Sequence, residues 1–180
     1  LIYATIAFTF RSYSQPFLLL FMIPFSIIGV AWGHYFHDFP INVLSALGII
    51  ALIGIMVNDG LVLIGKLNGS LKAGVKFEEA LMDAGKSRFR AIFLTSITTI
   101  AGLAPLLLEK SRQAQFLKPM AISISYGIGI ATILTLLMLP LLLSISNTIK
   151  TKAAWVKTGK EPSREDVERA IKELKEEDEA

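Results

Sequence analysis

The sequence predicts an all-α fold: a polytopic membrane helix bundle with a cytoplasmic helical tail. Of its 180 residues 53% are hydrophobic and only 18% are charged, whereas soluble domains carry about 25% charged residues. Four long apolar segments lie near 16–35, 43–65, 90–108 and 119–146. Each has about the length that a helix rising 1.5 Å per residue needs to cross a ~30 Å hydrocarbon layer. We therefore expect four transmembrane helices.

The opening LIYATIAFTF (1–10) is apolar but too short to span, because ten helical residues before Arg11 cover only about 15 Å. It is not a signal peptide, since no basic region precedes it and no small-residue cleavage site follows it. The simplest interpretation is a chain that begins inside a truncated transmembrane helix. The bundle would then be the end of one helix plus four complete ones.

The spans contain residues that would disturb soluble helices. Pro24, Pro105 and Pro140 lie within them, and membrane helices tolerate proline where neighbouring groups satisfy the freed carbonyls. Glycines recur as well, at Gly48, Gly54, Gly60, Gly65, Gly102, Gly127 and Gly129. Glycines let helix backbones approach closely. They also suit helices that slide past one another during transport, and the sequence leaves both interpretations open.

Loop charges set the orientation. The 66–90 connection carries six cations, namely Lys66, Lys72, Lys76, Lys86, Arg88 and Arg90. The positive-inside rule places this connection in the cytoplasm. Alternation then puts 11–15 and the C-terminal tail on the same side, with GHYFHDFPIN and EKSRQAQFLKP outside. A weaker cation excess at 109–118 has the opposite sign.

The 66–90 connection contains VKFEEALMDAGKSRF, in which Phe77, Leu81 and Met82 share one side. This pattern predicts a short amphipathic helix on the membrane surface, with a solvated linker helix as the alternative.

The 147–180 segment is highly charged. Ser163 and Asp166 resemble a capping box, and a narrow apolar stripe follows at Val167, Ala170, Ile171 and Leu174. We expect a soluble cytoplasmic tail because the segment is highly charged. A coiled-coil contact is the alternative, but two turns of stripe are too few to indicate one.

Several function classes are excluded or disfavoured. The chain has no cysteine, which excludes disulfides, thiolate metal sites and thiol nucleophiles. His34 and His37 lie beside Asp38, but without a further ligand a polar outer loop explains them better than a metal site. No phosphate-binding G-x-x-x-x-G-K-[ST] loop occurs. An intramembrane protease would need paired aspartates, or serine with histidine, inside the spans. We expect no enzyme, cofactor, metal or nucleic-acid partner, although the net charge is +3, because the charges lie at the membrane edges and in the tail.

GIMVNDGLVLIG (54–65) places Asn58 and Asp59 among apolar residues. A carboxylate there costs roughly 2.5–3.5 kcal/mol on insertion scales. Asp59 lies roughly 10 Å below the cytoplasmic boundary at Lys66. In the next span, Thr95, Ser96, Thr98 and Thr99 lie at similar depths, roughly 7–14 Å. The two helices therefore bring an acid, an amide and hydroxyls to one level of the bilayer.

The functional interpretation of this level is a proton relay. Burial disfavours the charged form of a carboxylate, so small rearrangements can switch its protonation. The alternative is that these groups only hydrogen-bond across packed helices. For single serines and threonines we favour packing. For Asp59 we favour the relay, because packing requires no titratable acid.

GIIALIGIMVNDGLVLIGKLN, the basic connection and SRFRAIFLTSITTIAGLAPLLL together resemble the C-terminal membrane region of resistance-nodulation-division (RND) efflux permeases. SQPFLLLFMIPFSIIGV and SYGIGIATILTLLMLPLLL extend the resemblance over about 1–146. It implies a multi-pass protein of the bacterial inner membrane that works as a homotrimer. Such permeases export drugs or other amphipathic compounds by proton antiport, with a periplasmic adaptor and an outer-membrane channel. The chain would supply the end of the eighth helix and helices nine to twelve, without the N-terminal half.

The sequence departs from the drug-exporting pattern at two adjacent positions. Where Asn58 stands, those permeases commonly carry a lysine that pairs with two aspartates, and where Asp59 stands they carry an asparagine. The resemblance retains the threonine at Thr95. We therefore expect a variant relay that uses its own carboxylate. The leading hypothesis is the membrane part of a proton-driven exporter, and the alternative is a truncated, nonfunctional or structural helix bundle.

Overall fold

The computed structural model describes residues 2–10, 12, 14–159 and 162–178. Leu1 and Arg11, on which the expected truncation and part of the orientation rest, lie outside them. The described residues form α1 (Ile2–Phe10), α2 (Ser14–His37), α3 (Val43–Lys72), α4 (Phe77–Leu108), α5 (Arg112–Thr158) and α6 (Arg169–Asp178). By length and composition, α2 to α5 are each long and apolar enough to cross a membrane. The protein is an all-α membrane helix bundle, as the sequence predicts.

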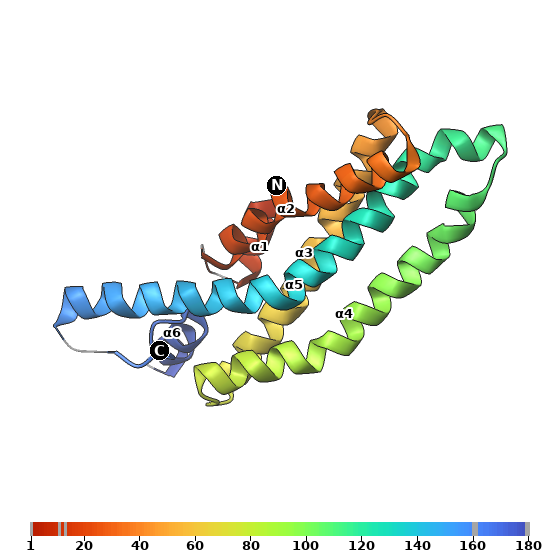
Figure 1. Ribbon diagram of the computed structural model, residues 1–180. Helices are drawn as coiled ribbons and strands as arrows, with labels where there is room; N and C mark the ends of the chain where they lie inside the picture. The colour runs from red at the N-terminus through yellow and green to blue at the C-terminus, as the bar shows by residue number, and fades with distance from the viewer. Residues whose placement is uncertain (1, 11, 13, 160–161, 179–180) are drawn as a thin grey trace.

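The longest helix, α5, forms the spine of the bundle. It packs against α2, α3 and α4, and its last turns project beyond them toward α6 (Figure 1). The connection between α3 and α4 lies at the same end of the molecule as the tail. The α2–α3 and α4–α5 turns lie at the opposite end (Figure 1). The expected cytoplasmic segments therefore share one end of the bundle.

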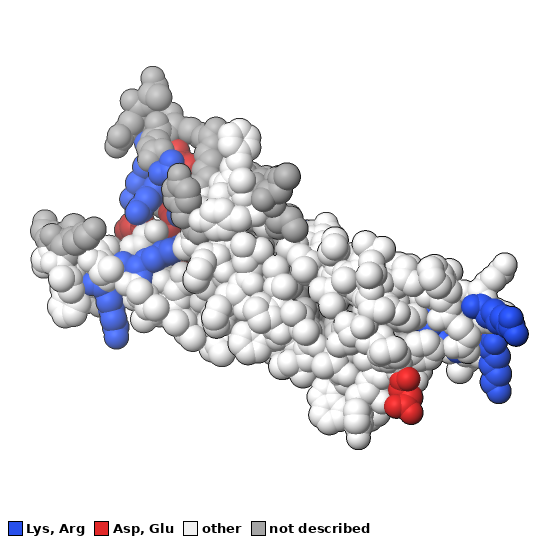
Figure 2. Space-filling view, turned by 90° about the horizontal axis from the view of Figure 1, so that it is seen from above, with Lys and Arg blue, Asp and Glu red and all other residues white. Residues whose placement is uncertain are grey.

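Charged side chains gather at the two ends of the elongated molecule, and the middle of the face in Figure 2 carries none. An apolar belt between two charged ends is the distribution that a hydrocarbon layer between two aqueous phases requires. Asp59 lies in α3 between the start of that helix at Val43 and Lys66.

Glycines let α5 approach α2 and α3 closely. A Cβ built on Gly29 would lie 2.5 Å from the carbonyl oxygen of Tyr126, and one on Gly48 would lie 2.7 Å from that of Met120. At Gly127 a Cβ would collide with Leu52, whereas Gly129 faces open space. Close packing therefore explains Gly48 and Gly127. It does not explain Gly54, Gly65, Gly102 and Gly129, at which an added Cβ meets nothing within 4 Å in the described part of the chain.

These glycines give a stability prediction. We expect Gly29→Ala to destabilise the full-length protein by about 1–3 kcal/mol, the cost of overpacking a filled interface. The backbone carbonyl of Tyr126 cannot move aside as a flexible side-chain tip would. Gly129→Ala is the matched control, and it should be neutral or stabilising because alanine favours helix and the site is open. Thermal unfolding in detergent measures both; equal melting temperatures would contradict the prediction.

The structure joins segments that the sequence analysis separates. The amphipathic stretch in 66–90 and the span at 90–108 form one helix, α4, which runs unbroken from Phe77 to Leu108. Phe77 is 1% exposed and Ala80 is fully buried. This end of the helix therefore packs into the bundle, because that buries its apolar side more completely than a membrane surface would.

Helix α5 likewise extends past the expected 119–146 at both ends. The Ser111 hydroxyl caps its start by accepting the Ala114 N–H. The helix ends only at Gly159, which has a φ of 68°, the left-handed conformation with which helices commonly terminate.

The tail folds back onto the bundle. Ser163 accepts the backbone N–H of Asp166 as expected, but the chain makes a turn there and α6 begins only at Arg169. Val167 and Ala170, from the expected apolar stripe, are buried, and α6 packs against α3. The apolar stripe therefore serves to dock the tail on the membrane bundle.

Glu165 in this tail caps α4. Its Oε1 accepts the backbone N–H of Phe77 at 2.7 Å, and Lys76, the N-cap residue of α4, makes no side-chain cap bond itself. The bond from Phe77 is the main reason that the pKa of Glu165 lies below its usual value. A carboxylate at a helix N-terminus also interacts favourably with the helix dipole.

The capping bond predicts that tail docking depends on pH. Because the pKa of Glu165 is lowered on folding, its contribution is complete above the unfolded value near 4.5 and is lost as pH falls through the folded value. We expect Glu165→Ala to weaken docking by about 1 kcal/mol at pH 7 and to reduce its acid sensitivity. Glu79→Ala removes an exposed acid from the first turn of α4, which Glu165 caps. It should change neither the docking of the tail nor its acid sensitivity. Hydrogen exchange at the Phe77 amide, at pH 7 and pH 4, measures both effects; identical profiles for Glu165→Ala and the parent protein would contradict them.

Candidate functional site

The polar interruption lies within α3. Asp59 is half-buried and Asn58 is exposed, while Met56, Val57 and Gly60 around them are buried. In the described part of the chain, no hydrogen bond or ion pair engages the Asp59 carboxylate or the Asn58 amide. The pair therefore lies at the border between the packed side of α3 and its open side.

The expected hydroxyls of α4 fall into two groups. Thr95, Thr98 and Thr99 each donate to a carbonyl of their own helix: Ala91 for Thr95 at 2.9 Å, Leu94 and Thr95 for Thr98, and Thr95 for Thr99 at 2.8 Å. Thr95 and Thr98 are exposed and Thr99 is partly so. Hydroxyls that bond back to the preceding turn are satisfied locally. These three threonines therefore need no partner on α3 for their protons.

Ser96 also donates to a carbonyl of its own helix, that of Ile92 at 2.9 Å, but it faces a neighbouring helix as well. It is 4% exposed, and its Oγ shares a short hydrogen bond with the Thr132 hydroxyl of α5. This pair joins α4 to α5, as polar pairs between membrane helices commonly do. Thr132 was not expected from the sequence, because several hydroxyl residues recur in its span, Ser123, Ser125 and Thr135 among them, and no pattern distinguishes one of them.

The open side of α3 is lined with small residues. An added Cβ at Gly54, Gly65 or Gly69 meets nothing within 4 Å among the described atoms. With Asn58 these glycines follow helical spacing along one face. A hollow of about 660 Å³ continues this face at the expected cytoplasmic end, between Val62 and Arg88.

The walls of this hollow carry charge. Lys66 and Asp83 form a 3.1 Å ion pair across α3 and α4, and both line the hollow together with Arg88, whose Nε is buried without a partner. The deepest lining residue on α3, Val62, lies one helical turn from Asp59. Space bordered by polar groups thus reaches from the membrane edge to within a turn of the intramembrane acid.

The two histidines serve packing at the opposite end. The Nδ1–H of His34 donates to the Phe39 carbonyl at 3.0 Å, and its Nε2 lies 3.0 Å from the Ser123 hydroxyl. His37 Nε2 lies 3.1 Å from the Tyr126 hydroxyl. The pair therefore ties the end of α2 to α5 instead of lying in a loop. Among the described residues no group of three potential metal ligands occurs.

A buried polar cluster also fastens the tail, and sequence analysis did not identify it. The Asn147 amide on α5 donates to the Arg164 carbonyl at 2.7 Å and to Glu168 Oε1 at 2.9 Å. Lys150 pairs with the other Glu168 oxygen at 3.0 Å. Arg164 also pairs with Glu78 and lies over the Phe77 ring. The tail is thus bound to α4 and α5 by charged and apolar contacts together.

Residues 1–146 match the profile of the AcrB/AcrD/AcrF family. The chain is 33% identical over 153 residues to the swarming motility protein SwrC of Bacillus subtilis (strain 168), covering 84% of this chain and 14% of SwrC. It is 25% identical over 155 residues to the multidrug resistance protein MdtC of Erwinia amylovora, covering 86% of this chain and 15% of MdtC. A crystal structure of a heavy metal efflux pump is similar with a TM-score of 0.73 and 28% identity, covering 82% of this chain and 14% of that pump. The chain spans about a seventh of the length of these relatives.

Proposed function

The chain belongs to the AcrB/AcrD/AcrF family, the RND efflux permeases that its sequence resembles, and from this premise we propose that it forms part of the membrane unit of a proton-driven exporter. In this unit Asp59 takes up and releases the proton. Asn58 and the Thr95, Ser96, Thr98 and Thr99 hydroxyls form its polar surroundings. The exporter is a multi-pass protein of the bacterial inner membrane, and its cargo is a drug or another amphipathic compound.

One observation carries this proposal: a carboxylate stands in the apolar middle of α3, at the border of a helix face on which the described chain leaves room. Intramembrane acids are costly and mark ion pathways by default. The hollow lined by Lys66, Asp83 and Arg88 supports the proposal, since a proton needs a polar route between Asp59 and the cytoplasm. Ser96, bonded to Thr132, contributes by holding α4 against α5.

The relatives suggest how the exporter assembles and which compounds it carries. Family resemblance favours a homotrimer that works with a periplasmic adaptor and an outer-membrane channel. The open side of α3 suits contact with further membrane helices of the full-length protein. The relatives include a multidrug resistance protein and a heavy metal efflux pump, so amphipathic organic compounds and metal cations are the two cargo classes to compare. We favour the organic class.

Transport by the full-length protein in liposomes tests the proposal. With a pH-sensitive dye inside and an imposed pH gradient, adding a cationic amphipathic dye should increase proton flux above the leak, and a protonophore should stop dye accumulation. Zn²⁺ should give no such flux if the organic class is correct. Dye transport that is indifferent to the protonophore would overturn proton coupling. A protein that moves neither the dye nor Zn²⁺ would favour the structural bundle.

A further inference from the structure

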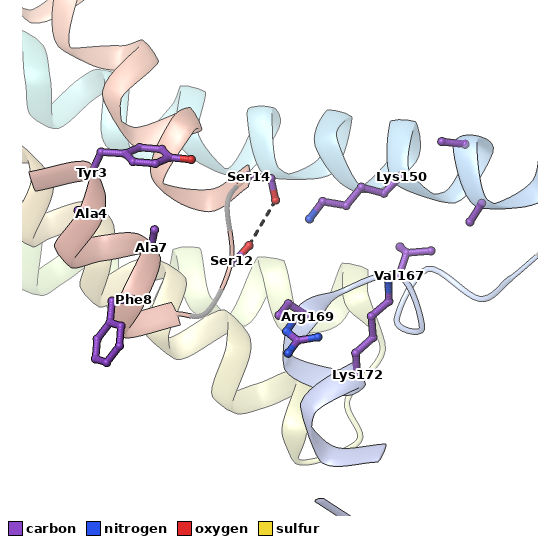
Figure 3. A pocket seen from close by; sticks show the side chains of 12 residues that line it. Tyr3, Ala4, Ala7, Phe8, Ser12, Ser14, Lys150, Val167, Arg169 and Lys172 are labelled. Atoms are coloured by element: carbon purple, nitrogen blue, oxygen red, sulfur yellow. Dashed lines mark hydrogen bonds between the residues drawn. The ribbon is translucent and has the colours of Figure 1, made fainter. Parts of the chain in front are cut away.

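A second hollow lies between α1, the end of α5 and the folded-back tail (Figure 3). Its volume is about 1250 Å³. Its floor is largely apolar: Tyr3, Ala4, Ala7 and Phe8 line it from α1, Ala153 and Ala154 from α5, and Val167 from the tail. Phe8 is 88% exposed. An apolar floor that continues into an exposed aromatic face suits contact with hydrocarbon better than with water.

Cations line the same hollow. Lys150 from α5 and Arg169 and Lys172 from the tail border it, and none of its described lining residues is acidic. Two carboxylates close by, Glu168 and Glu173, pair with Lys150, Lys72 and Arg169. Three described cations therefore line the hollow against these two acids, so the charge of the described residues around it is positive in excess.

The hollow lies at the expected membrane boundary. Ser12 and Ser14, at the turn between α1 and α2, line it and bond to each other. Lys150 lies four residues beyond the expected end of the 119–146 span. The apolar floor of the hollow, on α1, thus lies on the membrane side of the cationic walls. This arrangement is complementary to a phospholipid, in which the phosphate adjoins the acyl chains.

We propose that this hollow binds an anionic phospholipid of the cytoplasmic leaflet. The headgroup phosphate lies between Arg169 and Lys172, with the Ser12 and Ser14 hydroxyls within the same wall. One acyl chain lies along Ala4, Ala7 and Phe8 of α1. The docked tail supplies two of the three cations, so the site exists only while the tail is folded against α5. A free phosphate would share the cations but would leave the apolar floor without an occupant.

Lipid binding to the full-length protein tests this proposal. We expect native mass spectrometry to show phosphatidylglycerol bound in preference to phosphatidylcholine. Each cation near a membrane surface strengthens anionic lipid binding about fivefold, so Arg169→Gln with Lys172→Gln should reduce the preference by about 25-fold. Lys152→Gln, an exposed lysine on α5 that does not line the hollow, should leave it unchanged.

A second variant separates loss of the site from loss of tail docking. Ala4→Trp fills the exposed apolar floor without altering a charge, and it should weaken phosphatidylglycerol binding while the tail stays protected from protease. Retained preference in either the double variant or Ala4→Trp would overturn the proposal. So would complete displacement of the lipid by millimolar inorganic phosphate, since that would show a simple anion site.

Discussion

Asp59→Asn is expected to abolish proton-coupled export by the full-length protein while leaving its amount in the membrane unchanged. Asparagine keeps the shape and polarity of aspartate but cannot carry the proton. Positioned proton-transfer groups contribute about 100-fold or more to rates, so export should fall by at least about 100-fold. Removing the charge also relieves part of the roughly 2.5–3.5 kcal/mol insertion cost, so membrane insertion should not suffer.

The chain offers a matched control for this substitution. Asp38 ends α2 at the opposite side of the bundle with a φ of 56°, in the left-handed region that asparagine adopts as readily as aspartate. Asp38→Asn removes the same charge and should export normally. Ser96→Ala should cost about 0.6 kcal/mol of packing against α5 and weaken proton coupling far less than Asp59→Asn does. Normal export by a well-expressed Asp59→Asn protein would contradict the relay.

The fold was predictable because length and apolarity together distinguish membrane-spanning helices in a sequence. Each expected span lies inside an observed helix. The helix ends were not predictable, because they depend on tertiary contacts. Phe77 begins α4 inside the bundle because a tail residue 88 positions away caps that helix, and no local pattern contains such a contact. Helix α5 continues unbroken to Gly159. The only sign of this in the sequence is that no helix-breaking residue lies between Ser146 and that glycine.

The sequence predicted the depth of each candidate side chain in the membrane, but not the direction in which that side chain points. Spacing along two antiparallel helices gives the level of each side chain. Which side chains meet depends on how each helix is rotated against its neighbours. Ser96 and Thr95 are adjacent in sequence and so point about 100° apart on the helix, and only Ser96 reaches α5. The individual polar residues therefore indicated a layer, and the structure distributes that layer over an interface and an open face.

The tail contacts the helix that carries Asp59 and the two helices beside it. Glu173 of α6 pairs with Lys72 at the end of α3 at 3.3 Å, Glu165 caps α4, and Asn147 with Lys150 holds Glu168 against α5. The helix that carries Asp59 and its two neighbours are thus bound to one segment. Relative movement of these helices during a transport cycle must either strain these bonds or release the tail, so docking and transport should be energetically coupled.

Glu168→Ala should release the tail. Its carboxylate is 6% exposed and accepts hydrogen bonds from Asn147 and Lys150 at 2.9 and 3.0 Å. Its loss leaves the Asn147 amide, whose Oδ1 already lacks a partner, with one fewer bond in a buried place. Breaking a buried pair from one side costs about 3 kcal/mol at the lower end, which lowers the equilibrium constant for tail docking more than about 100-fold.

Limited proteolysis of the full-length protein measures this release, because residues 162–178 become cleavable only when the tail is undocked. Lys175→Gln is the control: Lys175 and Asp166 form an even shorter pair at 2.6 Å, but both side chains are largely exposed, and such surface pairs contribute about 0–1 kcal/mol. We expect rapid cleavage for Glu168→Ala and nearly parental cleavage for Lys175→Gln. Equal protection of the two variants would mean that the Glu168 carboxylate is dispensable and that the other contacts of the tail hold it in place.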